Sequence, residues 1–481
     1  GISGSASIAI STESTSVYSG ITKGGNNAGS SVTANGSVVV GAANADDIST
    51  YAGAISVSIN SGKGLGASIV VNTINGTTSA GISDSTVNAH GNGGAASIDN
   101  STLANAVDPT NDYTPASNPD LSNGTTTING VAVYAASRQT ADTVAAVLSA
   151  SNQGTAIAAN TITNVMGGTT QATIQSANIN KNLLSGETSA VRVGASSASY
   201  ANNLDVGAVG SSQGAAGTIV LVINTMNRTT TAKIDTTDIG SSSVSAGQVT
   251  VLANALQGTT GVAVGAALSG NSAAGTGSSL VNLFQSTTTA SLDHGTVYAN
   301  ALSVTANGNN GFFAAVGSGA IGSSAGIGAT VVVATSNNTV QAFVGDTDPS
   351  TAATDLHLSG ALAINASNTT SIESYAIVGS FGGSMGIAAQ FSGLIITNEV
   401  DAELRNTTVN TSGAVTVSAT ETDTLMPVVG GLAGGGSAGI GAAVNLVILK
   451  SNTKALMAGA TVTTTGDVTV SALSTRDVKP I

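Results

Sequence analysis

The side chains that could carry acid–base chemistry are few in this chain of 481 residues. Its three histidines, His90, His294 and His357, lie in separate stretches of the sequence, whereas a catalytic site needs its titratable groups to converge. Asp293 beside His294, with serines throughout the chain, suggests a Ser/His/Asp arrangement, but neither a nucleophile-elbow motif nor a base at motif spacing accompanies it. We therefore expect His294 to be a turn histidine and the chain not to be an enzyme.

Metal-binding groups are equally sparse. The chain has no cysteine, which excludes disulfides, cysteine-ligated zinc and thiol catalysis. The calcium-binding nonapeptide of secreted repeat proteins does not recur, and the most oxygen-rich spots are Asp46-Asp47 and Gly345-Asp346-Thr347-Asp348. Solvated turn aspartates account for both spots. We expect no cofactor, and calcium is the one metal that the acidic composition leaves open.

The composition describes an acidic chain with a core of small aliphatic side chains. It has 25 acidic and 12 basic residues, a net charge of -13, which argues against nucleic acid and anionic membrane surfaces as partners. Apolar residues make up 41%, but aromatic residues only 3% and Trp is absent. The longest apolar runs, such as Ile219 to Ile223, are far shorter than the roughly 20 residues of a membrane-spanning helix, so we expect no transmembrane segment. Because no initiator Met or apolar leader precedes Gly1, any export signal is expected outside this segment.

Two independent landmarks recur along the chain at matching intervals. One is a short strand resembling Gly-x-Val-Thr-Val-x-Ala, and the other is an alanine in a Thr-rich segment. The strand recurs every 53 to 60 residues apart from one step of 93. The intervals between successive alanines agree with those between the strands to within one residue, which indicates about eight copies of one unit. The last apolar residues of the strands are Val40, Val133, Val193, Val251, Val304, Ile364, Val417 and Val470. The alanines are Ala80, Ala172, Ala232, Ala290, Ala342, Ala402 and Ala455.

The long step is explained by an insertion near residues 90–129, which contains three of the six prolines. A smaller insertion lies near residues 345–354. We interpret residues 1–481 as a single repeat array from which these two loops leave, and loops on a repetitive scaffold can carry specificity. The candidate partner-contact residues of the larger loop are Asn100, Asp108, Asp112, Tyr113 and Asp120.

Within each unit, apolar residues alternate with small polar ones, as in residues 415–419, and this is the period of a half-buried strand. A unit of 53 residues is too short to close an immunoglobulin-type sandwich and must bury its faces against its neighbours. The sequence therefore predicts an all-β, elongated parallel β-solenoid (β-helix) of about eight repeats. With strands of five to eight residues and two or three coils per repeat, it would form a rod on the order of 80 to 125 Å long.

Three recurring residue types suggest finer features. Asn72, Asn224 and Asn282 each lie eight residues before an alanine landmark, where stacked amides could form an internal ladder, although ordinary turn asparagines are the alternative. Gly-rich stretches such as residues 430–439 are consistent with close packing of two sheets, with contacts between fibres or with flexible turns. Thr runs at 229–231, 287–289 and 463–465 would suit an ice-binding face, but the third follows its alanine where the others precede theirs.

The segments at 326–333 and 439–445, which open Gly-Ile-Gly-Ala, are each followed by a Thr-rich strand, and Gly466-Asp467-Val468-Thr469-Val470 closes the last unit. This pattern resembles the repeat regions of filamentous-haemagglutinin-like large exoproteins, and the resemblance covers essentially the whole chain. It implies a stalk exported by a Gram-negative bacterium, with a long β-helical shape and a role in surface adhesion, biofilm matrix or toxin delivery. No catalytic residues carry over.

The predicted function is therefore the structural shaft of an extracellular bacterial filamentous adhesin or biofilm-matrix fibre, located at the cell surface. Its expected partners are the cell surface, matrix polysaccharide or neighbouring copies of the same fibre. One alternative is a β-helical protein that binds or cleaves polysaccharide, which would require basic and acidic residues clustered along one groove, whereas the twelve basic residues are spread over all units. The other alternative is an ice-binding protein with a Thr face.

Overall fold

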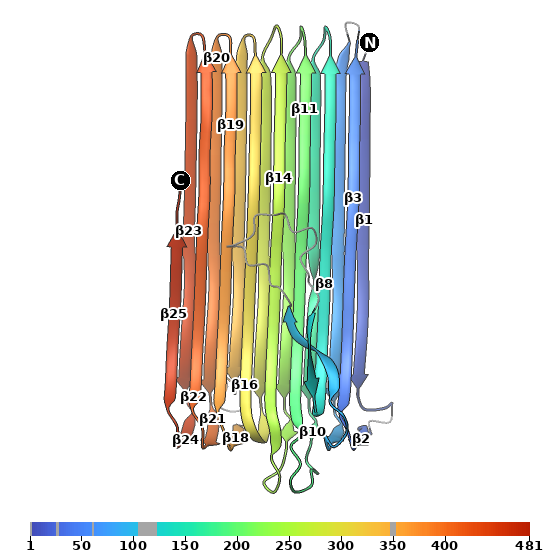
Figure 1. Ribbon diagram of the computed structural model, residues 1–481, viewed down its shortest axis with the longest axis vertical. Coiled ribbons are helices and arrows are strands. Elements are labelled where there is room, and N and C mark those ends of the chain that lie inside the picture. The colour runs from blue at the N-terminus through green and yellow to red at the C-terminus, as the bar shows by residue number, and fades with distance from the viewer. Residues whose placement is uncertain (1, 26–27, 60–61, 104–122, 347–352) are drawn as a thin grey trace.

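Parallel strands stack side by side through nearly all of this molecule in a computed structural model, which describes residues 2–25, 28–59, 62–103, 123–346 and 353–481. The described residues form strands and turns and contain no helix, so the predicted all-β parallel solenoid is confirmed. Accordingly, no helix in these ranges is long and apolar enough to cross a membrane. Figure 1 shows two layers of long strands whose stack runs from the N-terminal side at the right to the C-terminal side at the left.

The first layer, sheet A, contains eight long parallel strands, one from each repeat. They alternate strictly between inward and outward side chains, because successive residues of a strand point to opposite faces. In spatial order they are β1 (Ile2–Ile21), β4 (Lys63–Ser83), β9 (Ala156–Gln175), β12 (Ala216–Asp235), β15 (Ala274–Asp293), β17 (Ala325–Val344), β20 (Met385–Arg405) and β23 (Ala438–Ala458).

The second layer, sheet B, combines a row of long strands with a row of short strands near one end. The long strands are β3 (Val38–Ser58), β8 (Gly130–Ser151), β11 (Ala190–Ser211), β14 (Ala246–Ser269), β16 (Gly295–Gly322), β19 (Leu362–Gly382), β22 (Val415–Gly435) and β25 (Val468–Val478). The short strands are β2 (Ser31–Ala34), β5 (Thr86–Ala89), β10 (Asn178–Ile179), β13 (Asp238–Ile239), β18 (Thr354–Leu358), β21 (Thr407–Thr411) and β24 (Thr461–Thr464), and the first part of β16 continues this row.

Each repeat makes one coil, which runs along a sheet A strand, through a short strand and back along a sheet B strand. Both landmarks are in register at every step: Val251 pairs with Val193 and Val304, and Ala232 pairs with Ala172 and Ala290. The expectation of two or three coils per repeat is wrong. Eight strands about 4.8 Å apart stack over roughly 34 Å, whereas a strand of 20 residues extends about 66 Å, so the long axis in Figure 1 follows the strands.

Two kinds of corner connect the sheets. At the end of sheet A, a residue with positive φ turns the chain into the short strand, as at Asp84, Thr236, His294 and Asn406, and Asp, Asn and His tolerate this conformation better than most residues. At the other end, tight turns join sheet B to the next sheet A strand. There, Ser211 Oγ accepts a hydrogen bond from Gly214 N (2.8 Å) and donates one to Gly154 O of the preceding coil (2.7 Å).

The interior changes character along the strands. Near the short strands it holds the landmark Val and Ala side chains with Ile and Leu, which form a continuous aliphatic core. Near the tight turns the interior is narrower and holds Gly, Ala, Ser and Thr with Val147 and Val209. A Cβ added at Gly207 would lie 2.6 Å from Thr218 Oγ1, and one at Gly265 would lie 2.6 Å from Thr276 Oγ1. Of the three explanations for the glycines, close approach of the two sheets therefore applies here.

The larger insertion leaves the stack between β5 and β8. Its described parts form an antiparallel pair outside the two large sheets, β6 (Ala96–Leu103) with β7 (Asn123–Ile128). Ile98 and Ile128 are buried against Ala132 of β8, which attaches the pair to the outer face of sheet B. Residues 104–122 and 347–352, in the centres of the two predicted insertions, lie outside the described residues.

Candidate functional site

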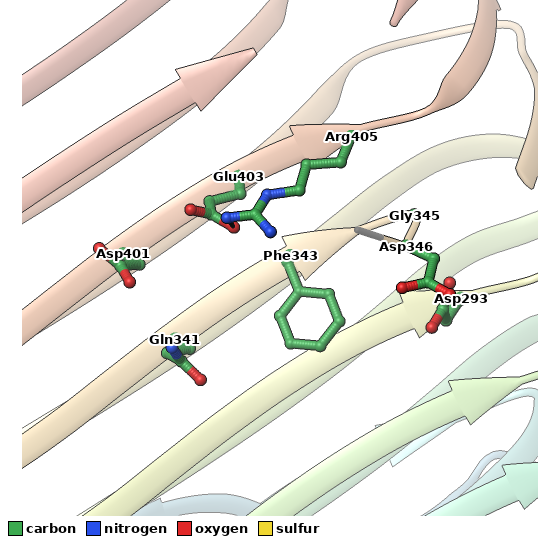
Figure 2. A pocket seen from close by; sticks show the side chains of 8 residues that line it. All are labelled: Asp293, Gln341, Phe343, Gly345, Asp346, Asp401, Glu403 and Arg405. Atoms are coloured by element: carbon green, nitrogen blue, oxygen red, sulfur yellow. Dashed lines mark ion pairs between the residues drawn. The ribbon is translucent and has the colours of Figure 1, made fainter. Parts of the chain in front are cut away.

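The charged side chains of sheet A gather on its outer face close to the short strands. Because the strands are parallel and in register, equivalent residues form rows across them, as in Gln341–Asp401–Lys454 and Phe343–Glu403. Figure 2 shows the hollow of about 290 Å³ that these rows line on β15, β17 and β20. Its lining residues are Asp293, Gln341, Phe343, Gly345, Asp346, Asp401, Glu403 and Arg405.

Most charges in this hollow are paired with one another. Arg405 forms an ion pair with Glu403, and Lys454 Nζ lies 2.7 Å from Glu403 Oε1 and 3.9 Å from Asp401 Oδ1. Burial raises the pKa of Asp401, the Lys454 ammonium lowers it, and the neighbouring Glu399 and Glu403 raise it further. None of the eight lining residues carries a hydroxyl or thiol nucleophile. The hollow is thus a salt-bridge network beside the ring of Phe343.

His294 joins carboxylates from three successive coils at the edge of this hollow. Its Nδ1 lies 3.2 Å from Asp235 Oδ1 and 3.4 Å from Asp293 Oδ1, and its Nε2 lies 3.3 Å from Asp346 Oδ2. It occupies the turn between β15 and β16 with a φ of 48°. Asp346, from the smaller predicted insertion, points toward Asp293 in Figure 2.

The pKa values of the groups in this cluster shift in different directions. Burial lowers the pKa of His294, but the hydrogen bond with Asp235 and the charges of Asp293, Asp235 and Asp346 outweigh burial and raise it. Burial raises the pKa of Asp235, yet hydrogen bonds with Lys233 and His294 hold it below its usual range. Burial is the largest cause of the raised pKa of Asp293. The surrounding carboxylates thus favour the charged form of His294.

Asp235, Asp293 and His294 are also the described residues that could hold a metal ion, since one ligand atom from each lies within 4.8 Å of the others. Carboxylate and imidazole groups suit zinc or other divalent metals. The ion pairs to His294 and Lys233 already account for the cluster without a metal. Its geometry therefore explains a charged corner but does not by itself assign a ligand.

The two oxygen-rich spots from the sequence lie in different surroundings. Asp46 and Asp47 are neither a calcium pair nor solvated turn residues: they sit in the middle of β3, and alternation sends Asp46 inward and Asp47 outward. Asp46 accepts hydrogen bonds from Thr15 Oγ1 (3.0 Å) and Asn44 Nδ2 (2.7 Å) inside the stack. In the other spot, Asp346 belongs to the cluster around His294, and Thr347 and Asp348 lie outside the described residues.

The structure places Asn72, Asn224 and Asn282 in one buried row of amides. Asn72 Nδ2 donates to Asn164 Oδ1 (2.8 Å), Asn164 Nδ2 to Asn224 Oδ1 (2.9 Å) and Asn224 Nδ2 to Asn282 Oδ1 (2.7 Å). Sequence reasoning missed Asn164, although it also lies eight residues before an alanine landmark.

A second amide pair was missed altogether. Asn338 Nδ2 donates to Asn398 Oδ1 at 3.2 Å. Both residues lie four positions before an alanine landmark, so counting back from the alanines would have identified them.

Sequence reasoning also missed a buried arginine. Arg228 is 1% exposed, and its guanidinium donates to Gly167 O (3.1 Å), Ser137 Oγ (2.9 Å) and Thr170 Oγ1 (3.2 Å). Burial lowers its pKa to about 10, partly offset by the Asp46 charge. This group holds coils together and faces no cavity among those described.

The histidines do not converge. His90 Nδ1 lies 2.7 Å from Glu187 Oε2, and His357 stacks on Tyr298 with ring centroids 4.6 Å apart. Of the candidate partner-contact residues, Asn100 lies in β6, and Asp108, Asp112, Tyr113 and Asp120 lie outside the described residues.

The Thr runs on sheet A do share a register, unlike the run at 463–465, which begins in β24 of sheet B. One outward row crosses five adjacent strands and consists of Thr77, Thr169, Thr229, Thr287 and Thr339.

A second surface feature lies at the opposite end of the strands, where large apolar side chains point outward on both faces. We define the apolar half as the outward positions from the tight turns to the Val165 row on sheet A and to the Leu204 row on sheet B. Its prominent exposed residues on sheet A are Ile8, Ile69, Ile157, Ile219, Ile327 and Ile440, and on sheet B they are Ile55, Leu148, Leu204, Leu268, Ile321 and Ile377.

Charge is almost excluded from this half. Among the described outward residues of this half, Lys63 beside a tight turn is the charged one, and Asp205 lies in the interior between the two faces. Burial raises the pKa of Asp205 to about 7. The described part of the molecule thus has an apolar end with few charges and a charged end, a division that composition alone did not reveal.

Comparisons with protein-family models, with curated protein sequences and with solved structures find no match to this chain.

Proposed function

We propose that this chain is the structural shaft of an extracellular bacterial filamentous adhesin or biofilm-matrix fibre and that it catalyses no reaction. The observation that carries the proposal is the unbroken register of the stack: both landmarks pair from coil to coil over the whole described array. Such an array gains length and stiffness from nearest-neighbour contacts alone. The resemblance of its repeats to those of filamentous-haemagglutinin-like exoproteins supports the same role.

The chemistry of the surface supports a structural role over a catalytic one. The acidic hollow is occupied by internal ion pairs, and its lining contains no hydroxyl or thiol nucleophile. The partners we propose are the cell surface, matrix polysaccharide and neighbouring copies of the fibre. The charged end would face polar partners, and the apolar half would face a surface that excludes water.

The outward row of five threonines keeps ice binding as a second candidate, because regular hydroxyls about 4.8 Å apart form a flat array. One neighbouring outward row consists of Asn, Gly and Gln, and the other places Thr231 and Thr289 between Gln171 and Gln341, so hydroxyls occupy only part of the surrounding surface.

Three measurements on the purified chain separate the candidates: attachment of coated beads, release of reducing sugar ends and thermal hysteresis. Beads coated with the purified chain are expected to attach to bacterial cells or extracted matrix polysaccharide more than beads coated with the denatured chain, and to release no reducing sugar ends from the polysaccharide. Release of reducing ends would make the chain an enzyme, and thermal hysteresis with no attachment would make it an ice-binding protein.

A further inference from the structure

The apolar half exposes large apolar side chains on both of its faces. Its interior holds Gly, Ala, Ser and Thr together with buried aliphatic side chains such as Val220 and Val222, and further Ile, Leu and Val side chains point outward, with Ile219 63% exposed and Ile377 55% exposed. Exposed apolar patches larger than a few hundred Å² are rare on monomeric proteins and mark interaction surfaces. These two faces therefore lack a partner in the isolated chain.

We propose that the apolar half of sheet A packs against the apolar half of sheet B on a second copy of this chain. This inference deepens the proposed function by naming one partner, and it can fail while the shaft role stands. Its basis is that both faces are apolar at the same end of the strands. A closed dimer through sheet A alone would leave the sheet B patch in water, whereas sheet A on sheet B covers both patches with one kind of contact.

The size of the patches fits such an interface. On sheet A, nine residues of each of eight strands cover roughly 30 by 34 Å, or about 1,000 Å². The sheet B patch, about seven residues long on each of the seven long strands that reach it, covers roughly 23 by 29 Å, or about 700 Å², close to the roughly 800 Å² per partner of a stable protein interface. The strands on both faces are parallel and in register, so rows of side chains can interdigitate as packed sheets do.

The ends of the strands favour a protein partner over a lipid one. If the apolar half entered hydrocarbon, the tight turns would be its deepest part. These turns are polar: residues 151–154 read Ser-Asn-Gln-Gly and residues 211–214 read Ser-Ser-Gln-Gly. A partner lying flat on each face leaves them in water. An interface of sheet A on sheet B is also not self-complementary, so it extends to a third copy and produces open-ended lateral assemblies.

The test uses charge substitutions on each face of the full chain. The sheet A variant is Ile219→Glu with Ile327→Glu, the sheet B variant is Leu268→Glu with Ile377→Glu, and the matched control is Thr229→Glu with Thr339→Glu, on the same strands and face as the sheet A variant but in the charged half. All four sites of the two test variants are exposed, and circular dichroism with thermal melting checks that each variant folds. Light scattering after size exclusion then gives the mass over a hundredfold range of concentration.

We expect the wild type and the control to grow beyond dimers, and each face variant to be monomeric. An equimolar mixture of the two face variants should form dimers and stop there, because each supplies the face that the other lacks. The proposal is overturned if the wild type stays monomeric, if neither face variant reduces its mass, if the sheet B variant still dimerises alone, or if the wild type binds phosphatidylcholine vesicles without self-association.

Discussion

The buried asparagine row makes the clearest quantitative prediction. Asn224 is fully buried in β12 and sits at the centre of four hydrogen-bonded amides. Its Oδ1 accepts from Asn164 (2.9 Å) and from Asn203 (3.2 Å), and its Nδ2 donates to Asn282 Oδ1 (2.7 Å). Replacing Asn224 with Ala removes all three bonds at once.

The consequences for the partners differ. Asn164 Nδ2 keeps a second acceptor, Asn203 Oδ1. Asn203 Nδ2 and Asn282 Oδ1 lose their partner in this row, and each buried polar group left without a partner costs about 1 to 3 kcal/mol. We expect Asn224→Ala to destabilise the surrounding coils by about 2 to 6 kcal/mol, where each 1.4 kcal/mol changes an opening equilibrium tenfold.

Hydrogen–deuterium exchange is the suitable assay, because a stack of coils can open locally and a single global unfolding free energy is not well defined. Backbone amides of β9, β12 and β15 should exchange at least tenfold faster in Asn224→Ala. The matched control is Asn227→Ala, which changes an exposed asparagine three residues along the same strand and should alter exchange less than threefold. If the two variants exchange alike, the amide row contributes nothing to stability and the reasoning is wrong.

Three further outcomes follow from the structure. Deleting Asn100 to Ser122 should leave circular dichroism and the melting temperature nearly unchanged, because the pair of β6 and β7 lies outside both large sheets. The same deletion in the full-length protein should weaken attachment of the cells that carry it, and unchanged attachment would mean that the loop has no partner. EDTA should leave the melting temperature unchanged, because His294 and Lys233 already pair with the carboxylates of the cluster, and a large drop would reveal a structural metal. Asp205→Asn should raise the melting temperature at pH 8 but much less at pH 4. The pKa of Asp205 in the folded protein, about 7, lies above its unfolded value, so the wild type loses up to about 4 kcal/mol of stability as pH rises from 4 to 7. Equal melting curves for both proteins at every pH would contradict this.

The sequence predicted the fold class and the register but not the width of a coil. The dipeptide Asn75-Gly76 is typical of a tight turn, yet both residues lie in the middle of β4. Ladder hydrogen bonds from the coils on both sides hold Gly76 extended, so its flexibility has no effect there. The true corners are marked by single residues with positive φ, such as Thr236 and His294, which no dipeptide pattern distinguishes from strand residues.

The charged corner was only partly predictable. Asp235 and Asp293 both lie three residues after an alanine landmark, so the repeat alone places them side by side on neighbouring strands. Nothing in the spacing shows that His294 turns back toward them, because that depends on a left-handed backbone at the corner. Arg228 was equally hidden: its position corresponds to Gly168 and Ser286 in the adjacent coils, and a charge there is unexpected until the polar interior around Ser137 and Thr170 is known.

Alternation along a strand divides its side chains between two faces but does not say which face is inside. On β12 the landmark Ala232 and the neighbouring Ile234 are fully buried in the aliphatic core, and they fix the even-numbered residues as inward. The strand then continues without a bulge, so Ile219, Leu221 and Ile223 must point outward, although they are its most hydrophobic stretch. On β14, Val249 and Val251 are buried in the core, so the odd-numbered residues point inward and Leu268 points outward. The residues buried in the core at one end of each strand thus determine which side chains point outward at the other end. The apolar half follows from this alternation, continued over about 20 residues, rather than from local hydrophobicity.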